Sequence, residues 1–211
     1  KKIIEQNTKK NVKVIGNPRY IKRKKYSINT KIKKILWMPS YPKFSKDKLF
    51  NITNWLPAFQ KLNKKYNITI KFHPKIILDK KTRLFFNKHI NVITNPKQNL
   101  SELYDKNDLI VCDYGGSIFS AVYNRKPLVL LNNEISKFGL SDKNLEIILR
   151  DNFYSLEKFD NENLIKTIND MNKNYHKEYM KIKKLKNEIF GVQKTINEIF
   201  NDIIKLSNNS I

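Results

Sequence analysis

Short apolar runs alternate with helix-spaced apolar positions over the first two thirds of the chain. Runs of strand length occur at Val12–Ile15, Lys34–Met38, Ile68–Phe72, Ile90–Thr94, Leu109–Cys112 and Leu128–Leu131. Between several of them, apolar residues return every three or four positions, over Phe50–Tyr66, Ile76–Lys88 and Leu100–Tyr104. Strands that alternate with helices predict a parallel sheet with right-handed crossovers.

The pattern changes from about Phe159 onward, where only helical spacing remains. Three apolar stripes follow one another, within 164–171, 179–190 and 196–204, and Gly191 separates the last two. The chain is therefore predicted to belong to the α/β class. We expect a Rossmann-like parallel sheet flanked by helices, with a C-terminal helical tail packed on it.

The loop Asp113–Ser117 is the most informative local feature. It follows a strand of four apolar residues and contains the pair Gly115 and Gly116. Ser117 is predicted to be the N-cap of the next helix. Ligands bind at the carboxyl ends of strands in open α/β sheets, and the first turn of a helix favours an anion. The pattern predicts a phosphate site, although a glycine pair can also simply form a tight turn.

Composition limits the class of protein. The chain has 211 residues, of which 40% are hydrophobic and 11% aromatic, as in a folded domain. It has no apolar run of membrane-spanning length. It begins at Lys1 without a methionine or a signal-peptide pattern, so we expect a piece of a longer polypeptide. The single cysteine, Cys112, excludes an internal disulfide and fits a cytoplasmic location.

The formal net charge of +23 has two explanations. One is compositional, because the chain is rich in Lys, Asn and Ile. The other is a surface that attracts anions such as a nucleotide, a polyanionic polymer, an anionic lipid or a nucleic acid. Arginine is rare, so diffuse attraction by lysine is a better interpretation than base-specific recognition. Charge alone does not indicate a nucleic-acid partner.

Several common sites are excluded by their motifs. One cysteine and three histidines cannot make a zinc site of the usual kind, so no metal is expected. The sequence has no Gly-x-x-x-x-Gly-Lys-Ser/Thr and no Gly-x-Gly-x-x-Gly motif, so neither a P-loop kinase nor a dinucleotide oxidoreductase is supported. The Gly-x-Ser-x-Gly elbow of hydrolases is absent too. No cofactor is expected.

Four segments together resemble one known family. Asp113–Ser117 resembles the Asp-Tyr-Ser-Ser loop of the CDP-glycerol glycerophosphotransferases, the teichoic-acid and capsule polymerases with a GT-B fold. Val14–Tyr20 resembles the family's Gly-x-Pro-Arg segment, and Ile70–Pro74 its His-Pro motif at a strand end. Ile35–Ser40 is similar to a strand that closes in Ala-Pro-Thr. The segments stand in the family's order and lie within residues 12–131.

The resemblance implies the C-terminal, donor-binding half of a GT-B transferase. Residues 1–30 would be a first strand and basic connector from an N-terminal domain of the same polypeptide, 31–158 the nucleotide-binding core, and 159–211 helices packed on that core. The implied reaction moves a polyol phosphate from a CDP-activated, CDP-glycerol-like donor to a hydroxyl of a teichoic acid or capsule polymer, and releases CMP. The acceptor would be polymeric or lipid-linked. The implied location is cytoplasmic, with peripheral contact at the inner face of the cell membrane.

The resemblance also assigns roles to residues. His73 would contact the donor diphosphate, where an imidazolium donates hydrogen bonds to the leaving phosphate; a lone histidine at a strand end can also be structural. Gly115, Gly116 and Ser117 would bind the donor phosphates, with Tyr114 in the same loop. Asp113 would orient the loop or contact a hydroxyl.

The segment after the first core strand departs from the family. Pro39 and Ser40 would border the same cleft. The family often has an arginine after this position, whereas this chain has Tyr41, Pro42 and Lys43. Lys43 could supply the charge as a point donor instead of a fork. The glycine pair also removes a hydroxyl ligand that the family's serines provide. All three strand ends are predicted to lie on one edge of the sheet.

Two other functions fit the sequence. One is a GT-B glycosyltransferase or sugar epimerase that uses a UDP-sugar, because these enzymes share the same phosphate site. The other is a non-catalytic basic module that binds nucleic acid or an anionic membrane. A cluster of basic residues on one face would favour the second alternative.

Overall fold

The structure is a computed structural model, and it describes residues 30–42, 46–93, 95, 97–131, 145–190 and 195–208. The chain divides into two compact units. One is Ser27–Leu185 and the other combines Lys1–Tyr26 with Lys186–Ile211. The sheet and the candidate site belong to the first unit, so the fold is described for that unit.

A six-stranded parallel sheet forms the centre of this unit. Its strands are β1 (Lys34–Met38), β2 (Asn67–Lys71), β3 (Asn91–Ile93), β4 (Leu109–Cys112), β5 (Leu128–Leu131) and β6 (Tyr154–Leu156). The strand order is β3-β2-β1-β4-β5-β6. The chain therefore winds one way from β1 to β3 and the other way from β4 to β6. The winding reverses between β1 and β4, and open α/β sheets bind their ligands outside the carboxyl ends of the strands at such a reversal.

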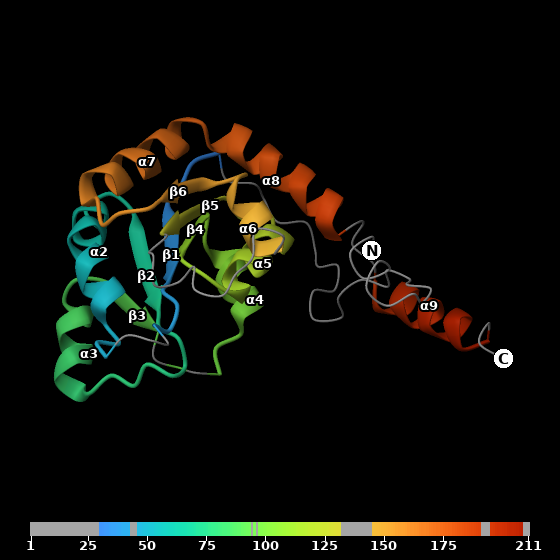
Figure 1. The fold of residues 1–211 in the computed structure, drawn as a ribbon, viewed down its shortest axis with the longest axis horizontal. Helices are drawn as coiled ribbons and strands as arrows, with labels where there is room; N and C mark the ends of the chain where they lie inside the picture. The colour runs from blue at the N-terminus through green and yellow to red at the C-terminus, as the bar shows by residue number, and fades with distance from the viewer. Residues whose placement is uncertain are drawn as a thin grey trace. The chain divides into compact units, whose positions relative to one another are not determined.

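Helices cover both faces of the sheet (Figure 1). They are α2 (Phe50–Leu62), α3 (Lys80–Asn87), α4 (Leu100–Lys106), α5 (Gly116–Tyr123), α6 (Leu145–Arg150) and α7 (Asn161–Lys173). Helix α8 (Tyr175–Phe190) begins in the same unit and ends in the other, to which α9 (Ile196–Asn208) belongs. Figure 1 shows α2 and α3 on one side of the sheet and α4 and α5 on the other. Helix α7 contacts both α2 and β6.

The strand register explains these two layers. Ile35 and Ile68 are paired and completely buried, and with their alternate neighbours they belong to the core cluster shared with α2 and α7. In this core the rings of Trp37 and Phe59 stack with their centroids 3.8 Å apart. The opposite face carries Leu36 and the residues aligned with it, and α4 and α5 contact the sheet there. A strand buried on both faces needs the near-continuous apolar runs seen in this sequence.

The predicted fold class is confirmed, and the predicted strands within the described residues are confirmed to within about one residue at each end. The strand predicted at Val12–Ile15 lies outside the described residues. The division of the chain at residues 30 and 158 stays a prediction. None of the described helices is long and apolar enough to cross a membrane.

Three predictions of secondary structure were wrong or incomplete. The helix expected from Ile76 begins only at Lys80, because the Asp79 carboxylate accepts the Thr82 N–H at 2.9 Å and caps it. Helix α2 ends at Leu62, before the predicted end at Tyr66, and contains Pro57. The sequence analysis did not predict α6 or β6.

Candidate functional site

Three loops of the predicted site follow neighbouring strands at the same edge of the sheet. Pro39 and Ser40 follow β1, the His73 loop follows β2, and Asp113–Ser117 follow β4. The Ser40 N–H donates to Asp113 Oδ1 at 2.6 Å, which joins two of the loops. The ring centroids of Tyr41 and His73 are 5.7 Å apart, so the His73 loop also contacts the segment after β1. Lys43, also predicted here, lies outside the described residues.

Asp113 connects two of these loops. Its side chain is 3% exposed, and both groups of Ser40, the hydroxyl and the backbone N–H, hydrogen bond to its carboxylate. Burial raises the pKa of Asp113 to about 6, although these hydrogen bonds act in the opposite direction. Because the carboxylate already faces Ser40, its position fits loop orientation better than direct contact with a charged ligand.

The glycine pair shapes the start of α5. Gly115 is the N-cap of α5. Its backbone has φ +103° and ψ −165°, a conformation that residues other than glycine rarely adopt. The prediction of Ser117 as the N-cap was therefore wrong, and Ser117 lies in the first helical turn. A Cβ atom at Gly115 or Gly116 would meet nothing within 4 Å. No described residue accepts a hydrogen bond from the N–H of Gly116 or Ser117, so both remain available to an anion.

The N–H of Gly115 has a different partner. It donates to Glu146 Oε1 at 3.0 Å, so the phosphate role predicted for Gly115 depends on its conformation and not on its N–H. The same oxygen lies 3.0 Å from Arg150 Nη2, one turn further along α6. Arg150 Nη2 also donates to the Asp113 carbonyl oxygen at 2.6 Å.

Tyr114 completes this buried cluster beneath the loop. The Arg150 guanidinium carbon lies 3.6 Å from the centre of the Tyr114 ring, a cation–π contact. Tyr114 is buried, and burial raises the pKa of its hydroxyl to about 12. The Tyr114 side chain thus lies among interior residues, and not in the open space around Gly116. Glu146 and Arg150 were not predicted from the sequence, in which their separation by four residues on a short helix is the available signal.

Ser117 is held from two sides. Its carbonyl oxygen accepts the Tyr104 hydroxyl at 3.2 Å, and its side chain hydrogen bonds to the Cys112 thiol. Burial raises the pKa of Cys112 to about 12, so this thiol is not a nucleophile at neutral pH. Among the residues described here, no group of three His, Cys, Asp or Glu side chains could hold a metal ion.

The His73 ring is held by the backbone of its own loop. Its Nδ1 accepts the Lys75 N–H at 3.1 Å, which places the ring proton on Nε2. Burial, Lys75 and Lys71 all lower the pKa of His73 below its ordinary value. The ring therefore offers one N–H donor, at Nε2, and the imidazolium predicted beside the donor diphosphate stays a prediction.

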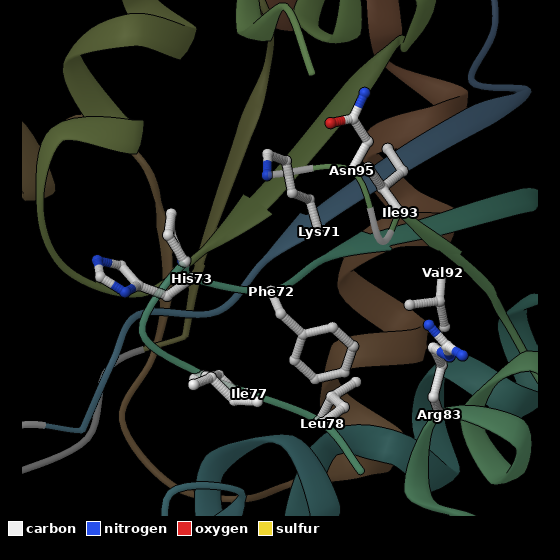
Figure 2. Close-up of a pocket in the computed structure, with 11 residues that line it drawn as sticks. Lys71, Phe72, His73, Ile77, Leu78, Arg83, Val92, Ile93 and Asn95 are labelled. Carbon is white, nitrogen blue, oxygen red and sulfur yellow. The ribbon is translucent and has the colours of Figure 1, made fainter. Parts of the chain in front are cut away.

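A cavity of about 290 Å³ opens beside His73, at the carboxyl ends of β2 and β3 (Figure 2). Its polar lining comes from Lys71, His73, Arg83 and Asn95, and the rest is mostly apolar. Lys71 is only 7% exposed. Lys71 was not predicted as a site residue, because polar residues at alternate positions of a strand are usually exposed to solvent.

The chain matches one family model over residues 8–198, described as CDP-Glycerol:Poly(glycerophosphate) glycerophosphotransferase. This range includes every described strand of the sheet. No protein with a curated description matches significantly.

Solved structures with a similar fold include two kinds of enzyme. The wall teichoic acid polymerase TagF aligns with 18% identity and a TM-score of 0.56, over 85% of this chain and 46% of the polymerase. A variant of TagF soaked with CDPG aligns with a TM-score of 0.53 and 18% identity, over 85% of this chain and 44% of that one. UDP-GlcNAc 2-epimerase from Neisseria meningitidis, bound to UDP-GlcNAc, aligns with 15% identity and a TM-score of 0.51, over 84% and 44%. The chain spans less than half the length of each, and identities this low show a shared fold.

Proposed function

Since this chain belongs to the CDP-glycerol:poly(glycerophosphate) glycerophosphotransferase family, we propose that it is the donor-binding half of such a transferase. It binds a CDP-activated, CDP-glycerol-like polyol and supports transfer of the polyol phosphate to a hydroxyl of a teichoic acid or capsule polymer. The observation that carries the proposal is the meeting of three loops at one sheet edge, beside two unpaired N–H groups of α5 within the described structure.

Each group has a role in holding the diphosphate. The N–H groups of Gly116 and Ser117 and the positive end of α5 bind phosphate oxygens. His73 donates its Nε2–H to the same group. Asp113 keeps Ser40 and the loop after β4 together. Pro39 borders the cleft on the β1 side.

The reaction determines which of these contacts accelerate it. The acceptor hydroxyl oxygen attacks the phosphorus that carries the polyol, and the bond from this phosphorus to the oxygen shared with CMP breaks. The hydroxyl proton passes to a base, which we assign to the N-terminal domain. Negative charge grows on the leaving CMP phosphate, so donors fixed beside it stabilise the transition state more than the ground state.

The cavity beside His73 suits the nucleoside end of the donor. It lies next to the proposed diphosphate site, and its apolar walls include Phe72 and Val92. The Asn95 amide can both donate to and accept from a base. The nucleobase is a flat ring with polar edge atoms, which fits a cavity lined mainly by apolar residues and a few polar ones.

The partners follow from the same proposal. They are a CDP-polyol or another nucleotide-activated donor, a polymeric or lipid-linked acceptor, and an N-terminal domain of the same polypeptide. We place the protein in the cytoplasm, with peripheral contact at the inner face of the membrane. The charge of +23 favours that contact, because basic residues attract anionic lipids.

Calorimetry with a nucleotide panel tests the proposal. We expect the chain to bind CDP, CDP-glycerol and CDP-ribitol at least about tenfold more tightly than CMP, UDP-GlcNAc or ADP, a difference of about 1.4 kcal/mol. The second phosphate supplies the gain over CMP. Tighter binding of UDP-GlcNAc would instead support the alternative function, an enzyme that uses a UDP-sugar. The fold shared with the epimerase is the observation in favour of that alternative. Absence of binding by every cytidine nucleotide at low millimolar concentration would contradict the proposal, and a basic module would then remain.

A further inference from the structure

Lys71 is a buried cation without a counter-ion. It ends β2 and is 7% exposed. No carboxylate or other acceptor among the described residues pairs with its ammonium group, and burial alone accounts for the lowered pKa of Lys71. An isolated ammonium is costly to remove from water. An anion bound beside the cavity would offset this cost.

The strand register places Lys71 on the same face of the sheet as α5. Thr69 pairs with Leu36, and Leu36 pairs with Ile110, so Lys71, two residues beyond Thr69, continues the same face. Cys112, two residues beyond Ile110, lies in the corresponding row of β4 and contacts the Ser117 side chain. Only β1 separates β2 from β4, a spacing of about 10 Å that a lysine side chain and a diphosphate together can span.

Lys71 also lines the cavity beside His73. In the view of Figure 2 its side chain turns away from Phe72, and its ammonium ends between the His73 ring and the Asn95 amide. Its charge reaches His73, where it helps to lower the pKa of the imidazole. The ammonium is therefore oriented toward the ligand side of the sheet edge.

We infer that Lys71 is a phosphate ligand of this site. Its ammonium pairs with the bound diphosphate, on the side opposite the N–H groups of Gly116 and Ser117. This inference rests on the proposed function for the identity of the ligand, a nucleoside diphosphate. An ammonium bonded to phosphate in a buried site forms a charge-assisted hydrogen bond, which is stronger than a neutral one. Binding thus removes the cost that the free protein carries.

Lys71→Met tests this inference, because it keeps the length of the side chain and removes the charge. We expect the melting temperature of the unliganded chain to rise, since an unpaired buried charge is lost. We expect CDP affinity to fall by about 10- to 100-fold, the range for a hydrogen bond to a charged group. CMP affinity should fall less. Lys71→Gln, which retains a polar end, serves if the methionine variant does not fold.

Lys126→Met is the matched control. Lys126 precedes β5 at the opposite edge of the sheet, burial lowers its pKa, and its Nζ donates to the Asp105 carbonyl oxygen at 3.3 Å. The same substitution there removes a partnered cation, so we expect a lower melting temperature and unchanged CDP affinity.

Inorganic pyrophosphate separates this inference from the proposed function. If the wild-type chain binds pyrophosphate with a Lys71-dependent affinity but shows no preference for CDP, the anion site stands and the proposed donor fails. If Lys71→Met lowers the melting temperature and leaves the affinities for CDP and pyrophosphate unchanged, Lys71 is a structural residue and the inference is overturned.

Discussion

Replacement of His73 by alanine is expected to lower the kcat of the transferase by about 10²- to 10³-fold, the usual effect of removing one donor beside developing charge. The same change should leave the melting temperature nearly unaltered. His73 is only partly buried, and the hydrogen bond described for its ring is the one accepted from the Lys75 N–H. Little folding energy therefore depends on the imidazole, while the proposal assigns its Nε2–H to the diphosphate. Steady-state kinetics with a CDP-polyol donor and a thermal melt measure the two effects.

Two further variants sharpen this prediction. His176→Ala changes an exposed histidine on α8 and should alter neither rate nor stability. His73→Gln retains an N–H donor without a titratable ring, so it should recover part of the lost rate if the neutral imidazole acts as a donor. A His73→Ala variant that melts early and turns over normally would show that the histidine is structural.

Arg150→Met is expected to destabilise the fold by about 3–5 kcal/mol, the cost of breaking a buried ion pair from one side. The variant leaves Glu146, which is 7% exposed, without the guanidinium that lies 3.0 Å from its carboxylate. It also removes the donor to the Asp113 carbonyl and the cation over the Tyr114 ring. Chemical denaturation gives the free energy of unfolding, and calorimetry with CDP gives the effect on binding.

The double variant Glu146→Gln with Arg150→Met is the control. It removes both charges together, so it should recover part of the stability lost in Arg150→Met. CDP affinity should stay low in both, because neither restores the contact to the Asp113 carbonyl that supports the loop after β4. Arg150→Lys retains the charge without the planar fork and should be intermediate. Wild-type stability and CDP affinity in Arg150→Met would exclude the supporting role.

The centre of the sheet could be predicted because β4 and β5 are buried on both faces. All four residues of β4, and all four of β5, are buried, and such runs stand out from the polar sequence around them. Strand β6 gave no such signal, since two of its three residues are exposed and its position depends on pairing with β5. Helix α6 is too short for periodicity to identify it.

The site could be predicted only where it coincides with strand ends. The loops after β1, β2 and β4 follow apolar runs, so the sequence places them at one edge of the sheet. Glu146 and Arg150 contact residues 31 and 37 positions away, which no local pattern reveals. The lowered pKa of His73 depends on burial and on two lysines that the fold brings near. Gly115 capped α5 in place of Ser117 because its positive φ turns the chain before the helix begins.

A crystal structure of the chain soaked with CDP tests the central claim most directly. The diphosphate oxygens should lie about 2.7–3.2 Å from the N–H groups of Gly116 and Ser117 and from Nε2 of His73. The base should occupy the cavity at the ends of β2 and β3. A diphosphate bound away from these three loops, or at the opposite edge of the sheet, would contradict the account.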